Sequence, residues 1–158
     1  MDLLRGTEVK TVFGNETLDP EDMDLWDKSL EFLKNEEPEK ALVAMCLMRK
    51  HTSKTMFNMS EIYRKLGSYE DALKAIRFAL YLDPFLAIAY YKRGNLHYDM
   101  KRFVSALRDF ELAELAMHGN SYIDYEQMGM IARLYQAEAR IRVPTDGHEF
   151  LFCPRVIM

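Results

Sequence analysis

Two stretches of the sequence align with each other without gaps: residues 60–79 read SEIYRKLGSYEDALKAIRFA, and residues 94–113 read GNLHYDMKRFVSALRDFELA. Corresponding positions lie 34 residues apart and hold side chains of similar size. Glycine and proline are scarce, and the apolar residues recur at i, i+3 and i+4, which is typical of helices. The sequence therefore predicts helices that repeat. The pairs that define the repeat are Ser60/Gly94, Tyr63/His97, Ala72/Ala106, Ile76/Phe110 and Ala79/Ala113.

A period of 34 residues is typical of the tetratricopeptide repeat, whose unit is a pair of antiparallel helices. Small residues such as Ala72 and Ala106 let the two helices of a pair approach closely, and large residues fill the groove between neighbouring pairs. We expect turns at residues 66–69 and 100–103, and we expect Asp83-Pro84 to end a helix. The predicted fold class is all-α, a tetratricopeptide-repeat helical solenoid.

A weaker copy of the repeat lies 31 residues upstream of the first stretch and runs from Leu25 to Met48. Asp19 is the predicted N-cap of its first helix, and Pro20 occupies the first helical position. Because this copy is three residues shorter than the others, we expect a tight loop near His51 and Thr52.

The repeats divide the chain into a flexible arm (1–18), a repeat domain (19–143) and a divergent tail (144–158). The repeat domain is expected to hold three helix pairs, an inserted loop or short hairpin, and a further helix. Their predicted bounds are 22–51, 53–84 and 87–118 for the repeats, 118–129 for the insertion and 130–142 for the lone helix.

Charge and composition exclude several classes of function. Lys and Arg number 21 against 25 Asp and Glu, so there is no basic surface for nucleic acid. No apolar stretch is long enough to enter a membrane, and the N-terminus lacks a secretory signal, so we expect a cytoplasmic protein. Cys46 and Cys153 are expected to be reduced thiols.

No motif for catalysis, metal or cofactor binding is present. The chain lacks a glycine-rich phosphate loop, the zinc-protease pair of histidines and the serine-hydrolase elbow, so we expect neither an enzyme nor a cofactor. His97 occupies the usual tyrosine position of the repeat, which favours a packed core histidine over a metal ligand.

Stacked helix pairs leave a concave surface that often binds a peptide, so a general peptide-binding scaffold is one hypothesis. In the well-known clamp for chaperone tails, Lys, Asn and Arg side chains line this surface. Of the corresponding positions here, only Asn58 and Lys92 carry suitable side chains. The full set of positions is Trp26, Leu30, Asn58, Ile88 and Lys92.

The repeat is interrupted after the third pair. A fourth repeat would place Asp124 and Arg140 where a large apolar residue and a small residue belong. Residues 118–127 instead form an insertion in which Gly119 is a predicted helix C-cap, and apolar and polar residues alternate after it. Such a loop on a rigid scaffold is a common place for a binding site, although a simple connecting turn would have the same spacing.

At this insertion the chain resembles the tetratricopeptide domain of the NADPH oxidase activator family, which includes neutrophil cytosol factor two. The motifs that carry the resemblance are LAIAYYKRG at 86–94, Gly119-Asn120, Ile123-Asp124-Tyr125 and Gln127-Met128-Gly129. The similarity runs without gaps from about Asp24 to Arg142.

The resemblance implies a module that binds the GTP-bound form of a Rac-type small GTPase. In a full-length relative, this module works with NADPH oxidase subunits to switch on superoxide generation, and its partners recruit it to membranes. The residues that correspond to the family's GTPase contacts are Ser53, Asp83, Phe85, His118, Asn120, Tyr122 and Asp124. Three of these depart from the family: His118 replaces an Arg, Phe85 a His and Tyr122 a Leu.

The C-terminus also departs from the family. Pro144 interrupts the predicted helix, and the tail after it follows neither the repeat nor the family. We therefore expect a C-terminally truncated form that lacks the family's activation segment. An apolar face on residues 131–142 would then be exposed or covered by residues 150–152 of the tail.

Overall fold

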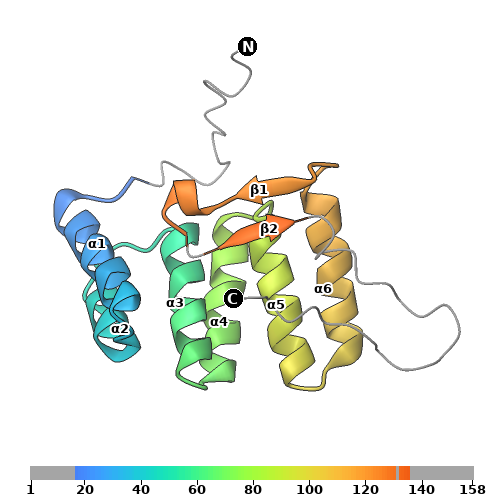
Figure 1. Cartoon of the computed structure of the whole chain (residues 1–158), viewed down its shortest axis with the longest axis horizontal. Coiled ribbons are helices and arrows are strands. Elements are labelled where there is room, and N and C mark those ends of the chain that lie inside the picture. The colour runs from blue at the N-terminus through green and yellow to red at the C-terminus, as the bar shows by residue number, and fades with distance from the viewer. Residues whose placement is uncertain (1–16, 131, 136–158) are drawn as a thin grey trace, which may run out of the picture.

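The computed structural model describes residues 17–130 and 132–135 of the chain. These residues form six helices that stand side by side in a row as antiparallel neighbours (Figure 1). This arrangement confirms the predicted all-α solenoid of helix pairs. The helices are α1 (Pro20–Lys34), α2 (Pro38–Cys46), α3 (Ser53–Lys65), α4 (Tyr69–Leu82), α5 (Ala87–Asp99) and α6 (Phe103–Ala116).

Small residues bring the helices of a pair together, as the repeat pattern predicts. Ala72 of α4 and Ala106 of α6 are buried. Gly94 of α5 faces the ring of Phe110, and a Cβ atom at Gly94 would lie only 2.7 Å from Cε1 of that ring. The close approach of α5 and α6 therefore depends on the absence of a side chain at this position.

The first helix begins as the sequence predicts. Asp19 caps α1 by accepting a hydrogen bond from the backbone N–H of Asp22 at 2.9 Å, and Pro20 is the first helical residue. Asp22 is itself buried, and its two carboxylate oxygens accept the backbone N–H groups of Arg49 and Lys50, each at 2.9 Å.

The expectation of a tight loop near His51 and Thr52 is wrong. The connection between α2 and α3 spans residues 47–52, whereas that between α4 and α5 spans only 83–86. The first repeat is shorter than the others because its second helix is shorter: α2 has 9 residues, whereas α4 has 14. The physical reason is the carboxylate of Asp22, which holds the backbone of the connection against α1 and ends α2 early.

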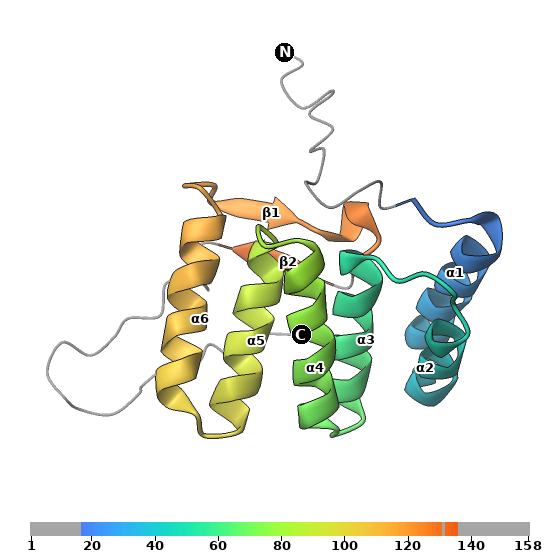
Figure 2. The ribbon, with the colours of Figure 1, turned by 180° about the vertical axis from the view of Figure 1, so that it is seen from behind.

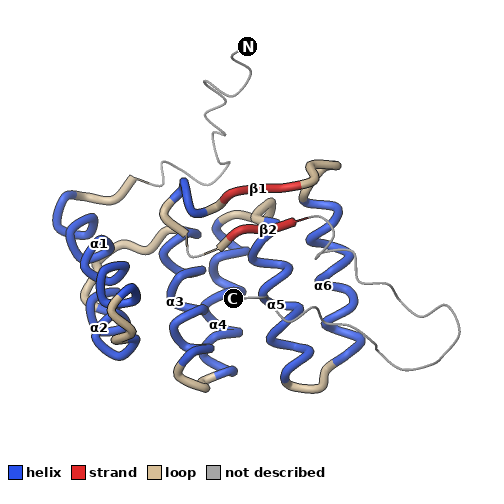
Figure 3. The backbone as a smooth tube through the Cα atoms, in the orientation of Figure 1, coloured by secondary structure: helices blue, strands red, loops and turns tan. Residues whose placement is uncertain are grey.

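The insertion is a short hairpin that follows α6. Strand β1 (Tyr122–Asp124) pairs antiparallel with strand β2 (Arg133–Tyr135), and a 3-10 turn at Glu126–Met128 lies between them. Figure 3 shows the two strands crossing one end of the helix row. No helix among the described residues is long and apolar enough to cross a bilayer.

The prediction of a lone helix over 130–142 is wrong at residues 133–135, which form β2. Leu134 is buried while Arg133 and Tyr135 are exposed, an alternation that a strand satisfies and a helix does not. The hairpin therefore extends past the predicted end of the insertion at 129. Met130 and Ala132 are not helical either, and residues 131 and 136–142 of that predicted helix lie outside the described residues, as do the arm up to residue 16, Cys153 and the tail 144–158.

Candidate protein-binding site

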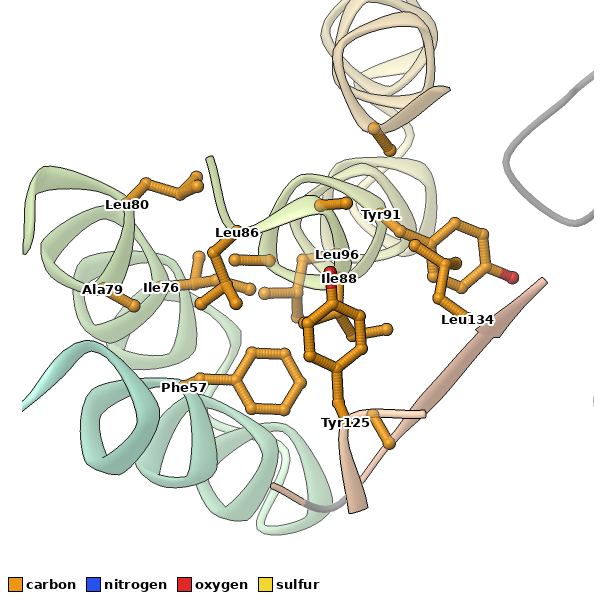
Figure 4. Close-up of a cluster of buried hydrophobic side chains, with 14 of the residues drawn as sticks. Phe57, Ile76, Ala79, Leu80, Leu86, Ile88, Tyr91, Leu96, Tyr125 and Leu134 are labelled. Atoms are coloured by element: carbon orange, nitrogen blue, oxygen red, sulfur yellow. The ribbon is translucent and has the colours of Figure 1, made fainter. Parts of the chain in front are cut away.

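Tyr125 anchors the insertion in the hydrophobic core. Its side chain is only 5% exposed and belongs to the main buried cluster. Figure 4 shows its ring beside Phe57 of α3 and Ile88 of α5. Burial raises the pKa of Tyr125 to about 12, although hydrogen bonds with the backbone of Ile88 and Ala87 act in the opposite direction. The hairpin is thus fastened to the start of α5 by a neutral phenol.

Gly129, in the turn between the two strands, fastens the insertion to the first two helix pairs. Its carbonyl accepts a hydrogen bond from the side-chain amide of Asn58, on α3, at 3.0 Å. Its backbone has a φ of +76°, and a Cβ atom here would lie 2.8 Å from Cζ2 of Trp26, on α1. Only glycine combines this left-handed conformation with contact against the indole ring.

The insertion contacts or lies beside four of the five positions that a peptide in the concave groove would need: Trp26, Leu30, Asn58 and Ile88. Asn58 is fully buried and bonds to Gly129, and Ile88 is buried in the cluster that also contains Tyr125. Lys92 pairs with Glu61 at 3.1 Å. The remaining two groove positions lie toward α1: Trp26 packs against Gly129, and Leu30 lines a pocket of about 420 Å³ beside the insertion.

The segment between α6 and β1 presents three of the predicted contact residues. His118 has a φ of +50°, and the side-chain amide of Asn120 donates to the carbonyl of Met117 at 2.8 Å, which caps the end of α6. His118 and Asn120 are exposed, and Tyr122 follows them in β1 with 39% of its surface exposed. The cap fixes the shape of this loop while leaving its outer surface accessible.

Asp124, a fourth predicted contact, is engaged within the hairpin itself. Its carboxylate accepts the backbone N–H of Glu126 at 3.0 Å and the side-chain amide of Gln127 at 3.3 Å. Burial raises the pKa of Asp124, but these bonds, one from Tyr122 and the charge of Arg133 hold that pKa below its usual range. Asp124 therefore shapes the turn after β1, and its side chain is only 19% exposed.

The connection between α4 and α5 places Asp83 and Phe85 near the hairpin. The carboxylate of Asp83 accepts the backbone N–H of Phe85 at 3.0 Å, and the Phe85 side chain is 68% exposed. Figure 2 shows this connection and β1 at the same end of the helix row. Ser53 differs from the other predicted residues, because it is only 1% exposed in the first turn of α3.

Sequence reasoning missed two exposed residues of β2. Tyr135 is 48% exposed and its ring lies 4.8 Å from that of Tyr122, measured between centroids. Arg133 forms ion pairs with Glu126 and Asp124. The signal for a strand was the alternation of Arg133, Leu134 and Tyr135, which matches the alternation in β1.

Other titratable groups form structural contacts. His97 is 8% exposed, its Nε2 atom lies 3.7 Å from Oδ2 of Asp109, and burial lowers its pKa. This confirms the prediction of a packed histidine at that position. Within the described ranges, no three His, Cys, Asp or Glu side chains lie close enough to hold a metal ion together.

Comparison with known proteins supports the repeat architecture and the resemblance. The family model described as TPR repeat matches residues 61–101. Neutrophil cytosol factor 2 from Bos taurus is 31% identical over 118 residues, which cover 75% of this chain and 22% of that protein. NADPH oxidase activator 1 from Rattus norvegicus is 30% identical over 109 residues, which cover 69% of this chain and 24% of that protein.

Among solved structures, the second TPR of Spaghetti (RPAP3), bound to an HSP90 peptide, superposes with a TM-score of 0.58 at 23% identity. The match covers 61% of this chain and 93% of that one, and it shows a common fold. The chain spans less than a quarter of the length of the two curated relatives, 22% and 24% respectively.

Proposed function

Because this chain contains tetratricopeptide repeats and is similar to neutrophil cytosol factor 2 and NADPH oxidase activator 1, we propose that it is a non-catalytic module that binds a GTP-bound small GTPase of the Rac type. The contact surface is the edge formed by the hairpin insertion and the connection between α4 and α5. We name this surface the hairpin edge; its members are Asp83, Phe85, His118, Asn120 and Tyr122.

The observation that carries this proposal is the position of the insertion on the helix pairs. Asn58 and Trp26, which face the concave groove in the peptide-binding hypothesis, instead contact Gly129. This occupation disfavours a peptide in the groove. The hairpin edge stays exposed, with Phe85 at 68% and Tyr122 at 39%.

The chemistry of the hairpin edge suits recognition of a protein surface. Exposed aromatic residues supply apolar contact area, and the loop that carries Asn120 is already shaped by its bond to Met117. A preformed loop loses little conformational entropy on binding. The net charge of −4 gives no strong bulk attraction, so specificity resides in these few contacts.

The name of one relative, NADPH oxidase activator 1, supports a role for the proposed module at an NADPH oxidase. It delivers a GTP-bound Rac-type protein to subunits of an NADPH oxidase complex, and it acts in the cytoplasm until such partners recruit it to a membrane. Asp124 acts as a positioning residue in this scheme, because its carboxylate holds the turn between the strands.

A pull-down with Rac loaded with either GTP or GDP tests the proposal. The wild type should capture the GTP-bound form preferentially, and Asn120→Ala should reduce that capture. Asp124→Asn should reduce it less than Asp124→Ala, because an amide oxygen can still accept the N–H of Glu126. Glu111→Ala, an exposed change on α6, serves as the matched control and should have no effect. Equal capture of both nucleotide states would refute the proposal.

A further inference from the structure

The two strands of the hairpin present a second row of side chains beside the predicted contacts. Their register places Tyr122 opposite Tyr135, Ile123 opposite Leu134, and Asp124 opposite Arg133. Leu134 is fully buried and Ile123 packs against the same core cluster, so the alternation turns the other two pairs outward. The outer face of the hairpin is therefore built from one aromatic pair and one charged pair.

The two tyrosine rings of the aromatic pair are exposed to solvent, although burying their apolar surface would be energetically favourable. The rings of Tyr122 and Tyr135 lie 4.8 Å apart at 36°, and the two side chains are 39% and 48% exposed. The inner pair already joins the hairpin to the core, so folding does not require two aromatic residues on the solvent side. Paired tyrosines on a rigid backbone lose little entropy when a partner covers them, which makes them suitable binding anchors.

The charged pair supplies a cation next to the rings. The guanidinium of Arg133 lies 2.7 Å from Glu126 and 3.8 Å from Asp124, and the Arg133 side chain is 51% exposed. An exposed ion pair of this kind holds the guanidinium in position but leaves donors available to a partner. Arginine and tyrosine are among the residue types enriched at the energetic centres of interfaces.

We propose that strand β2 belongs to the GTPase-binding surface, with Tyr135 and Arg133 as specificity-determining residues. This inference rests on the proposed function. The partner surface places an apolar side chain against the rings of Tyr122 and Tyr135 and directs a carboxylate to Arg133. The occupant is the same GTPase, because the ring of Tyr135 is in contact with that of Tyr122, which lies on the hairpin edge. A protein that covers the first ring also covers the second.

The experiment measures the dissociation constant of GTP-loaded Rac for variants of β2 in the full chain. Tyr135→Thr removes the ring but keeps a residue that favours strands, and it should weaken binding about tenfold. Tyr135→Phe keeps the ring and should stay within about twofold of the wild type. Arg133→Gln, an independent test of the cation, should weaken binding about fivefold. Tyr81→Thr, on α4, is the matched control for loss of an exposed tyrosine.

Trp26 reports whether the hairpin is still docked in each variant. It is the sole tryptophan of the chain, and its ring packs against Gly129 of the insertion. An unchanged emission spectrum together with weaker binding supports direct contact by β2. If the emission spectrum shows that the hairpin undocks in Tyr135→Thr, the inference is tested instead by comparing the dissociation constant of Arg133→Gln with that of the wild type.

Two results overturn the inference and separate it from the proposed function. Binding that weakens with Asn120→Ala but not with Tyr135→Thr or Arg133→Gln removes β2 from the interface and leaves the proposed function standing. No binding of GTP-loaded Rac by the wild type removes both.

Discussion

Asn58 and Gly129 lie 71 residues apart in the sequence and share a hydrogen bond of 3.0 Å. The bond joins the middle of α3 to the turn between the two strands of the hairpin, and Asn58 is fully buried. A buried amide that has lost its partner is costly, so this bond specifies one position for the insertion. The insertion is consequently part of the packed domain and contributes to its stability.

Replacing Asn58 with Ala should destabilise the domain and loosen the insertion. The loss of a buried hydrogen bond costs about 1–3 kcal/mol in the free energy of unfolding. Denaturant unfolding measures the loss, and Trp26 emission should shift to longer wavelength as water reaches the indole. Asn35→Ala, at the exposed end of α1, is the control. Unchanged stability and emission in Asn58→Ala would show that the bond does not hold the insertion in place.

Comparing two glycines that have almost the same backbone conformation distinguishes the cost of backbone strain from the cost of a steric clash. Gly129 has a φ of +76° and faces Trp26, whereas Gly67 has a φ of +77° and no atom within 4 Å of the point where a Cβ atom would lie. Gly67→Ala should cost about 1–2 kcal/mol, the usual penalty for a left-handed residue with a side chain. Gly129→Ala should cost about 1 kcal/mol more, because its new methyl group collides with the indole. Equal losses on thermal unfolding would contradict the contact.

Asp22 should make stability depend on pH in the acid range. The backbone N–H of Arg49 is the largest cause that holds the pKa of Asp22 below its usual value, with burial acting against it. A lowered folded-state pKa adds stability that is complete above about pH 4 and is lost as pH falls through that folded-state value.

The free energy of unfolding of Asp22→Ala should consequently fall less steeply with decreasing pH than that of the wild type. Chemical denaturation at a series of acid pH values measures the two slopes. Asp27→Ala, an exposed change on the same helix, should leave the wild-type slope intact. Parallel curves for wild type and Asp22→Ala would rule out this role for the carboxylate.

Restoring arginine at His118 should strengthen binding of the GTPase. The exposed His118 lies at the start of the insertion with a φ of +50°. A guanidinium there offers more donors and a permanent charge, worth about 1 kcal/mol at an exposed site. Isothermal titration of His118→Arg with GTP-loaded Rac measures the gain, and the GDP-loaded form is the control. An equal gain for both nucleotide states would indicate nonspecific charge attraction.

The helix pairs could be predicted because their sequence signals are local and repeated. Ala72 and Ala106 occupy equivalent positions in successive repeats, as do Ser60 and Gly94, and Asp19 with Pro20 marks the start of α1. The length of α2 could not be predicted, because it depends on bonds from Asp22 to a backbone 27 and 28 residues away. Such contacts leave no periodic pattern in the sequence.

The hairpin edge was predictable only in part. The resemblance indicated His118, Asn120 and Tyr122, and these lie together on the exposed side of the insertion. It could not indicate that Ser53 is buried or that Asp124 is engaged by Glu126 and Gln127, since both follow from packing in this chain. The three residues of β2 are too few for a strand pattern to outweigh the helical composition around them.

Hydrogen exchange of the chain with and without GTP-loaded Rac is the decisive test of GTPase binding at the hairpin, because it locates the contact surface along the backbone. We expect increased protection at residues 83–86, 118–124 and 133–135, with no change when Rac carries GDP. Protection confined to α1 and α3 beside the pocket at Leu30 and Leu33, with none in the hairpin, would contradict this expectation and favour binding in the concave groove.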